Sequence, residues 1–217
     1  MTARAETTDG SSPDQGGRPG DGKRTLRRGL LAARTGRPPG ERAAATAALS
    51  RHVISLASDT SGPVHCYLPI GGEPGAAAGA VPALPDVLLD AGHDVVVPVV
   101  PAEPGPLDWA RYTGPDGLVD GLFGTRQPAG PLLGTAAVAT AGLVLVPALA
   151  VDRSGRRLGR GGGYYDRTLP LVAAGAVVAV LLHDGELLDA VPAEPHDVTV
   201  GLVVLPGDGV VHVSSGR

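Results

Sequence analysis

The stretch LVPALAVDRSGRRLGRGGGYYDRTL, residues 145–169, combines the three kinds of local structure from which an open α/β fold is built. It begins at the end of an apolar run, 143–146, that is continuous in the way expected of a strand covered on both faces. A loop rich in glycine and arginine follows, and a helix is predicted to begin near Tyr164 or Tyr165 and to reach about Ala174. Ligands of open α/β sheets bind beyond the carboxyl ends of the strands, so this loop is a candidate binding segment.

Helices and strands are predicted to alternate on both sides of this stretch. Apolar residues at helical spacing predict helices over residues 23–34 and 41–57, and a short third helix is expected over residues 82–91. Other apolar runs predict strands over residues 64–68, 95–100, 177–182 and 198–205. The alternation predicts a single-domain α/β fold, a three-layer sandwich in which helices flank a mostly parallel central sheet, as in Rossmann-like proteins.

Residues 101–131 are rich in proline and glycine and are expected to form a long loop with short hairpin pieces. This segment holds the only tryptophan of the chain, Trp109, and the only phenylalanine, Phe123. Long loops in compact domains are usually either functional or disordered. The two aromatic residues favour a functional loop.

The composition predicts one cytoplasmic domain. A chain of 217 residues suits a single α/β domain. Residues 1–22 hold almost no large apolar side chain, so a disordered leader is expected there, followed by the domain over residues 23–217. The leader lacks the apolar core of a secretory signal, and no apolar run is long enough to cross a membrane. The single cysteine, Cys66, suits a reducing compartment, and we expect a monomer.

The charge distribution favours a small anionic ligand over a nucleic acid. The net charge is −4 and the isoelectric point is about 5.8, so the chain as a whole has no excess of basic residues. Basic residues nevertheless gather in two islands, residues 23–34 and 153–167. Two such islands on an acidic protein fit a small polyanion.

The glycine-rich loop has the composition of an anion site. Its glycines let backbone N–H groups approach an anion, and a helix N-terminus adds partial positive charge. Arg156, Arg157 and Arg160 add forked donors that suit phosphate oxygens. The spacing is neither that of a Walker A loop nor that of a dinucleotide fingerprint. Glycine and arginine content alone would equally fit a solvated turn.

The string from Asp152 to Leu169 resembles the signature of the 5-formyltetrahydrofolate cyclo-ligase family. The matching positions are Asp152, Gly155, Arg157, Leu158, Gly159, Gly161, Gly163, Tyr164, Tyr165, Asp166, Arg167 and Leu169. The resemblance extends more thinly from Lys23 to about Leu205. It therefore covers the chain apart from the leader and the last residues.

Shorter landmarks of the family fall in the expected order. They are Lys23-Arg24-x-Leu26-Arg27, Tyr67-Leu68-Pro69-x-x-x-Glu73, Phe123-Gly124-x-x-Gln127-Pro128 and His196-Asp197. Two positions depart from the family's pattern: Gly201 stands where an aspartate is often found, and Leu205 where threonine is usual. If that aspartate helps to hold a metal in relatives, this chain must manage without it.

The resemblance implies an ATP-dependent, ring-closing C–N ligase of one-carbon metabolism. Such an enzyme converts 5-formyltetrahydrofolate into 5,10-methenyltetrahydrofolate, with ADP and phosphate as products, through a phosphorylated formyl intermediate. The implied partners are small molecules, ATP as co-substrate and the folate, with Mg²⁺ as cofactor. Neither a nucleic acid nor a membrane is expected as a partner.

The resemblance also implies roles for individual residues. Lys23 and Arg157 are implied to be catalytic, and Asp166 is implied to bind Mg²⁺. The residues implied to bind ATP are Lys23, Arg24, Arg27, Arg157, Leu158, Gly159, Arg160, Gly161, Gly162, Gly163, Tyr164 and Tyr165. The residues implied to bind the folate are Leu68, Glu73, Phe123, Tyr164 and Tyr165.

Two other functions stay open at this point. One is an enzyme on the same fold that keeps the phosphate loop but acts on a different substrate, and the other is a nucleotide- or folate-binding regulator without turnover. Lys23 also fits a solvated basic helix face, and Asp166 fits an acid in the first turn of a helix. The histidines show no spacing typical of metal ligands, which argues against a zinc site.

Overall fold

The computed structural model describes residues 21–192, 194 and 197–213. The leader expected over residues 1–22 lies outside this part of the chain, except for Asp21 and Gly22, which begin the first helix instead. Within the described residues, no helix combines the length and the apolar content that a membrane span requires.

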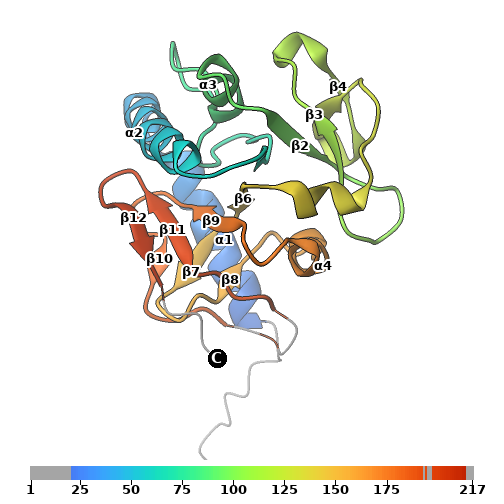
Figure 1. The fold of residues 1–217 in the computed structure, drawn as a ribbon. Helices are drawn as coiled ribbons and strands as arrows, with labels where there is room; N and C mark the ends of the chain where they lie inside the picture. Colours follow the sequence, from blue (N-terminus) through green and yellow to red (C-terminus); the bar gives the residue numbers. More distant parts are fainter. Residues whose placement is uncertain (1–20, 193, 195–196, 214–217) are drawn as a thin grey trace, which may run out of the picture.

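A seven-stranded sheet forms the centre of the domain (Figure 1). Its inner five strands are parallel, as predicted, and lie in the order β11-β9-β6-β1-β2. They are β1 (Val64–Cys66), β2 (Val95–Val99), β6 (Leu143–Pro147), β9 (Val177–Leu181) and β11 (Leu202–Leu205). Two antiparallel edge strands complete the sheet: β3 (Asp108–Arg111) beside β2, and β12 (Gly209–His212) beside β11. Neither edge strand was predicted, because each has only four residues and lies next to Pro or Gly, which is too short for an alternating pattern to be recognised.

Alternate residues of the strands face two different cores. Leu143 and Leu145 of β6 pack with the helices α2 and α3, whereas Val144 and Val146 pack on the opposite face. Figure 1 shows α2 and α3 together on one side of the sheet and α4 on the other. The longer helices are α1 (Asp21–Gly36), α2 (Pro39–Ser58), α3 (Leu84–Asp90) and α4 (Tyr164–Thr168). The flanked, mostly parallel sheet confirms the predicted fold class.

The second face is covered by short helical segments rather than by a long helix. These are the 3₁₀ turns η3 (Thr135–Thr140) and η4 (Leu169–Leu171) together with α4. The prediction that the helix at Tyr164 reaches Ala174 is wrong: α4 ends at Thr168 and η4 at Leu171. Pro170 explains the early end, because proline lacks the N–H group that would continue an α-helix.

The predicted strand over residues 198–205 begins only at Leu202. The backbone N–H of Val200 instead donates to the carbonyl oxygen of Gly155 at 2.9 Å, and the N–H of Gly155 donates to the carbonyl oxygen of Asp152 at 2.9 Å in the adjoining turn. A Cβ atom at Gly155 would lie 2.2 Å from the carbonyl oxygen of Val200, so only glycine allows this approach. The contact fixes the turn before the glycine-rich loop to the C-terminal part of the chain.

Small strands outside the main sheet carry the loops of interest. A three-stranded sheet joins β10 (Leu187–Leu188), β7 (Ala150–Asp152) and β8 (Arg157–Leu158). A hairpin of β4 (Leu118–Asp120) and β5 (Arg126–Pro128) lies within residues 101–131; the turn η1 (Pro115–Gly117) precedes it, and the turn η2 (Leu122–Gly124) connects its two strands. The hairpin confirms the expected short pieces in this loop. Strands of two or three residues are too short to predict from periodicity.

A buried ion pair attaches α1 to the sheet. Arg34, near the end of α1, donates two hydrogen bonds to Glu186, at 2.8 and 2.7 Å, and a third to the carbonyl oxygen of Ala148, at 2.6 Å. Both side chains of the pair are less than 5% exposed. Glu186 also accepts the backbone N–H of His183, whose Nε2 lies 3.0 Å from the carbonyl oxygen of Gly72. The network joins α1, the end of β6 and the loop that contains Gly72.

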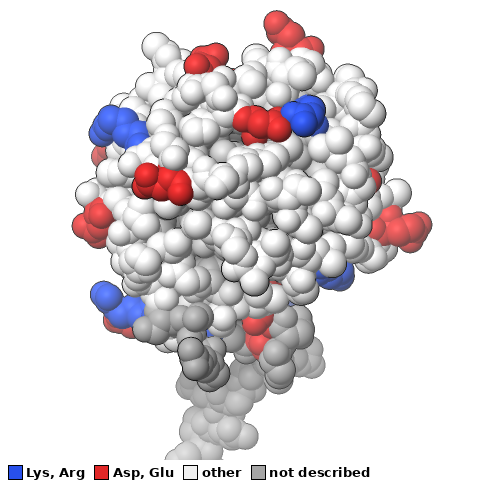
Figure 2. Space-filling model, in the orientation of Figure 1, with Lys and Arg blue, Asp and Glu red and all other residues white. Residues whose placement is uncertain are grey.

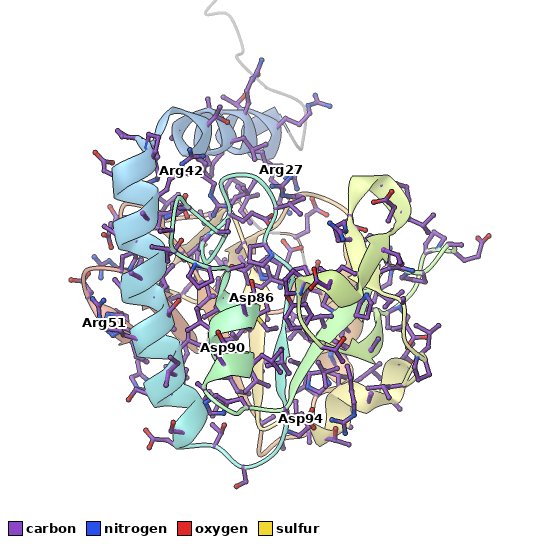
Figure 3. All side chains as sticks on the ribbon, turned by 90° about the horizontal axis from the view of Figure 1, so that it is seen from above. Arg27, Arg42, Arg51, Asp86, Asp90 and Asp94 are labelled. Atoms are coloured by element: carbon purple, nitrogen blue, oxygen red, sulfur yellow. The ribbon has the colours of Figure 1, made fainter. Side chains whose placement is uncertain are left out.

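Replacing Arg34 with alanine should lower the free energy of unfolding by about 3–5 kcal/mol, because the Glu186 carboxylate would stay buried without its cationic partner. Urea unfolding followed by circular dichroism measures the change. Arg51→Ala is the matched control, since Arg51 is exposed and points away from the domain on α2 (Figure 3). The control should change stability by less than about 0.5 kcal/mol. Equal effects of the two substitutions would contradict this role of the ion pair.

Candidate functional site

A cavity of about 590 Å³ lies at the carboxyl ends of β1 and β6. The strand order changes direction between these two strands: β2 lies beside β1 on one side, and β9 and β11 lie beyond β6 on the other. Such a switch point leaves a crevice between diverging connections, where open α/β sheets bind their ligands. Tyr67 and Leu68, which follow β1, and Ala148 and Leu149, which follow β6, line the cavity.

The cavity brings together the residues predicted from the sequence, with one exception. All residues predicted for ATP, folate and metal line it except Arg24, whose side chain is exposed on α1. Helix α1 contributes Lys23 and Arg27 from one side, and the β4–β5 hairpin contributes Phe123 from another. Figure 3 shows Arg27 on the side of α1 that faces the body of the domain. Arg156, although part of the same basic loop, does not line the cavity.

Asp152 holds the turn between β7 and β8 in shape. Its Oδ1 accepts hydrogen bonds from the backbone N–H and hydroxyl of Ser154, at 2.9 and 2.6 Å, and from the N–H of Arg156, at 3.1 Å. Its Oδ2 accepts the N–H of Val191 at 3.1 Å. Burial alone would raise the pKa of Asp152, but these hydrogen bonds outweigh it and lower the pKa below its usual value. The sequence showed Asp152 as a signature position without indicating this role.

The glycine-rich loop, residues 159–163, forms one wall of the cavity. Gly161 and Gly163 have φ angles of +108° and +67°, which side chains rarely adopt. A Cβ at Gly161 would approach the guanidinium of Arg27 at 3.7 Å, and Arg27 donates to the carbonyl oxygen of Gly159 at 3.0 Å. The helix after the loop has only five residues, so the backbone N–H groups and the arginines must supply most of the attraction for an anion.

Arg157 presents buried donors to the cavity. Its Nη2 pairs with Oδ1 of Asp166 at 2.6 Å, and its guanidinium carbon lies 6.0 Å from the centre of the Tyr165 ring. Its Nε and Nη1 are buried and have no hydrogen-bond partner among the described residues, and the same holds for the hydroxyl of Tyr165. Buried donors normally have partners, so these atoms indicate a position for an anionic or polar ligand. Burial also raises the pKa of Tyr165, so its hydroxyl keeps its proton.

Lys23, the only lysine of the chain, faces two carboxylates. Its Nζ lies 3.0 Å from Oε1 of Glu194 and 2.9 Å from Oδ2 of Asp197. Burial alone would lower the pKa of Lys23, but the two carboxylates raise it above its ordinary value, and the side chain remains a cation. Asp197 belongs to the His-Asp landmark, whose His196 lies outside the described residues. Glu194 has no motif that would have revealed it.

Glu73 and Arg160 form an ion pair across the cavity, with 2.9 Å between Oε1 and Nε. The other carboxylate oxygen of Glu73 accepts the backbone N–H of Ile70 at 2.9 Å. Glu73 was predicted for the folate and Arg160 for ATP, so the two predicted halves of the site touch. Phe123 completes the walls: its side chain is 78% exposed, and its φ of +56° is unusual for a residue other than glycine.

No group of three or more histidine, cysteine, aspartate or glutamate residues suited to a metal occurs in the described part of the chain. A metal cage made by the protein alone is therefore absent from those residues. Asp166 lies at the cavity, where its Oδ1 pairs with Arg157 and its side chain is 27% exposed. Mg²⁺ commonly takes only one or two carboxylates together with phosphate oxygens and water, so Asp166 fits that kind of binding.

Comparison with known proteins identifies the family that the chain matches. A sequence model described as the 5-formyltetrahydrofolate cyclo-ligase family matches residues 19–206. The 5-formyltetrahydrofolate cyclo-ligase of Mycolicibacterium smegmatis is 44% identical over 194 residues, which cover 87% of this chain and 96% of that protein.

Solved structures agree with the sequence comparison. The NMR structure of Aquifex aeolicus 5,10-methenyltetrahydrofolate synthetase has a TM-score of 0.66 at 28% identity and covers 90% of this chain and 94% of its own. The Mycoplasma pneumoniae 5,10-methenyltetrahydrofolate synthetase has a TM-score of 0.63 at 17% identity, covering 83% of this chain and 96% of its own, and supports the fold alone.

Replacing Asp152 with asparagine should lower the free energy of unfolding by about 2 kcal/mol at neutral pH, because an amide cannot accept all the hydrogen bonds of this turn. The pKa of Asp152 is lower in the folded protein, so its contribution is complete above the unfolded pKa of about 3.9 and is lost as the pH falls through the folded pKa. The difference between wild type and variant should therefore shrink in acid.

Urea unfolding at neutral pH and at a pH of about 3 measures both effects. Asp189→Asn is the matched control, because the Asp189 side chain is fully exposed, and its effect should be small at either pH. A difference for Asp152→Asn that stays constant between the two pH values would show that its carboxylate charge does not stabilise the turn.

Proposed function

The chain belongs to the 5-formyltetrahydrofolate cyclo-ligase family, and we propose that the cavity beside α1 is where it carries out that family's reaction. The enzyme uses ATP to convert 5-formyltetrahydrofolate into 5,10-methenyltetrahydrofolate. One observation supports this location above all: Lys23, Arg157, Glu73 and the loop of residues 159–163 line a single cavity.

The chemistry needs positioned charges rather than a protein nucleophile. The formyl group on N5 is amide-like and therefore a poor electrophile. Transfer of the γ-phosphoryl group of ATP to the formyl oxygen breaks the bond to ADP and makes the formyl carbon reactive. N10 of the same folate then attacks that carbon and loses its proton, and phosphate leaves with the former formyl oxygen. Because the attack is intramolecular, alignment of the reacting groups and stabilisation of the phosphoryl oxygens account for most of the catalysis.

We assign the phosphate end of the cavity to the basic residues. Residues 159–163 and Arg157 line the cavity, and we assign to the triphosphate their backbone N–H groups and the Nε and Nη1 of Arg157, which lack a partner among the described residues. Lys23 and Arg27 bring two more cations from α1. The Glu194 and Asp197 carboxylates orient the Lys23 ammonium, which lowers the cost of fixing this long side chain when ATP binds.

We assign the folate end to Glu73 and the nearby apolar and aromatic residues. Glu73 can accept hydrogen bonds from the amino and amide groups of the pterin. Tyr164 and Tyr165 offer rings beside the reacting groups, and Leu68 and Phe123 add apolar surface. A buried carboxylate next to such surfaces suits a flat, hydrogen-bonding ring system.

We propose that Mg²⁺ binds with ATP and that Asp166 is its protein ligand. Mg²⁺ would neutralise charge on the transferring phosphoryl group when bound. Asp166 can serve because its carboxylate lies at the cavity and only its Oδ1 is paired with Arg157. Arg24 does not line the cavity, so the assignment of that residue to ATP rests on the sequence motif alone.

We further propose that the enzyme is a cytoplasmic monomer without a nucleic-acid partner. The buried Cys66 and the small polar substrates suit the cytoplasm. Among the described residues on the face shown in Figure 2, basic side chains are scattered singly and do not gather into a patch.

Sedimentation velocity tests the monomer, since a dimer would sediment distinctly faster.

Arg157→Ala should reduce kcat/KM for ATP by at least about a hundredfold, because it removes a preorganised donor to the phosphates. Stability should fall by less than about 1.5 kcal/mol, since the Asp166 carboxylate left behind is partly hydrated. The absorbance of the methenyl product measures the rate, and thermal unfolding measures the stability. Arg156→Ala is the matched control in the same loop, and its rate should stay near that of the wild type. A variant of Arg157 that loses stability and activity together would indicate a structural arginine.

Asp166→Asn should raise the Mg²⁺ concentration needed for half-maximal rate by about tenfold, because an amide binds Mg²⁺ more weakly than a carboxylate. Titration of Mg²⁺ at saturating ATP and folate checks this. Arg157 pairs with Asp166, so the substitution can also weaken ATP binding. Saturating ATP keeps that weakening from altering the Mg²⁺ titration. An unchanged Mg²⁺ titration with a lower maximal rate would assign Asp166 to positioning Arg157 only.

A further inference from the structure

The Glu73–Arg160 ion pair connects the two ends of the cavity. Its partners come from separate parts of the chain, 87 positions apart, and meet with 2.9 Å between Nε and Oε1. The Glu73 side chain is 8% exposed, whereas that of Arg160 is 49% exposed. Because Oε2 of Glu73 already accepts the N–H of Ile70, Arg160 occupies the other oxygen of a buried carboxylate.

Arg160 can change partner because its guanidinium is half exposed to water. Arg160 lies within the glycine-rich loop, between Gly159 and Gly161, and this loop lines the end of the cavity that we assign to the phosphates. Water can solvate the half-exposed guanidinium when it leaves, but the buried Glu73 carboxylate then needs another partner, which the N–H groups of a pterin can supply. A triphosphate offers several negatively charged oxygens in a geometry that suits a guanidinium fork. When ATP binds, its phosphates are therefore a better partner for Arg160 than Glu73 is.

We propose that Arg160 couples the binding of the two substrates by moving between Glu73 and ATP. Without ATP, it holds the Glu73 oxygen that the pterin needs as a hydrogen-bond acceptor. With ATP bound, the oxygen becomes available to the folate. Arg160 is thus a positioning residue that acts on the folate through Glu73. This inference rests on the proposed assignment of the two ends of the cavity.

Coupling of this kind is reciprocal. If ATP raises the affinity for the folate by some factor, the folate raises the affinity for ATP by the same factor. The other cations do not connect the two ends in this way. Arg157 pairs with Asp166, and Lys23 pairs with Glu194 and Asp197, all of which belong to the phosphate end. In the described part of the chain, Glu73 is the only carboxylate at the folate end that forms an ion pair with a residue of the glycine-rich loop.

Isothermal titration of 5-formyltetrahydrofolate, with and without a Mg²⁺ complex of a non-hydrolysable ATP analogue, tests the proposal. In the wild type, the analogue should tighten folate binding by about tenfold. In Arg160→Ala, folate binding without nucleotide should be tighter than in the wild type, and the analogue should no longer change it. A purely structural arginine would give weaker folate binding in both conditions, and that result would overturn the proposal.

Two further variants sharpen the test. Arg160→Lys keeps the charge but loses the fork, so it should retain only part of the coupling, while Arg156→Ala should retain all of it. Glu73→Gln should weaken folate binding and abolish the coupling, because it removes the charge that Arg160 must leave. A wild type that forms methenyl product but shows no effect of the analogue on folate binding would refute the coupling alone. A wild type that forms no product would refute the proposed function itself.

Discussion

The buried pair of Arg34 and Glu186 sets the distance between α1 and the central sheet, and the geometry of the cavity depends on that distance. Separating two charges that are almost inaccessible to water would leave each one buried and unpaired. The end of α1 therefore has one stable position beside β6. Lys23 and Arg27 stand on the same helix and are placed by it. Through His183, the same network reaches the carbonyl oxygen of Gly72, next to Glu73. One ion pair therefore positions both the basic wall and the folate end.

Inside the cavity, positive side chains are held by acceptors before any ligand arrives. Arg157 has Asp166, Lys23 has Glu194 and Asp197, and Arg27 has the carbonyl oxygen of Gly159. These partners fix the directions of flexible side chains and reduce the reorganisation that binding requires. They also prevent a cluster of bare cations from destabilising the empty fold. Among the described residues, Nε and Nη1 of Arg157 have no such acceptor.

The sequence predicted the parts of the fold that depend on continuous apolar runs. All five parallel strands and the first three helices lie where those runs occur, because burial on both faces demands them. It did not predict β7, β8 and β10, since strands of two or three residues are too short to show periodicity. The end of α4 was overestimated even though Pro170 stands in the sequence as a stop signal.

For the site, every residue predicted from the motifs except Arg24 lines the cavity, because the glycine loop and its neighbours carry a strong pattern. The ion pairs between these residues could not be predicted from the motif. Lys23 and Glu194 are 171 positions apart, and nothing in either neighbourhood indicates that the two meet. Arg160 and Glu73 were assigned to different ligands, yet they bind each other. Contacts between distant loops follow from the topology of the sheet, which a local pattern does not contain.

The single lysine has a practical consequence for handling the protein. Seventeen of the eighteen basic residues are arginines, so Lys23 carries the only side-chain amine. Lys23 is therefore the only side chain that amine-acylating reagents can modify. The same holds for resins or surfaces that couple to side-chain amines. Because that amine is mostly buried and paired with two carboxylates, labelling of side chains should be slow, and any label that does attach will block the entrance to the phosphate end.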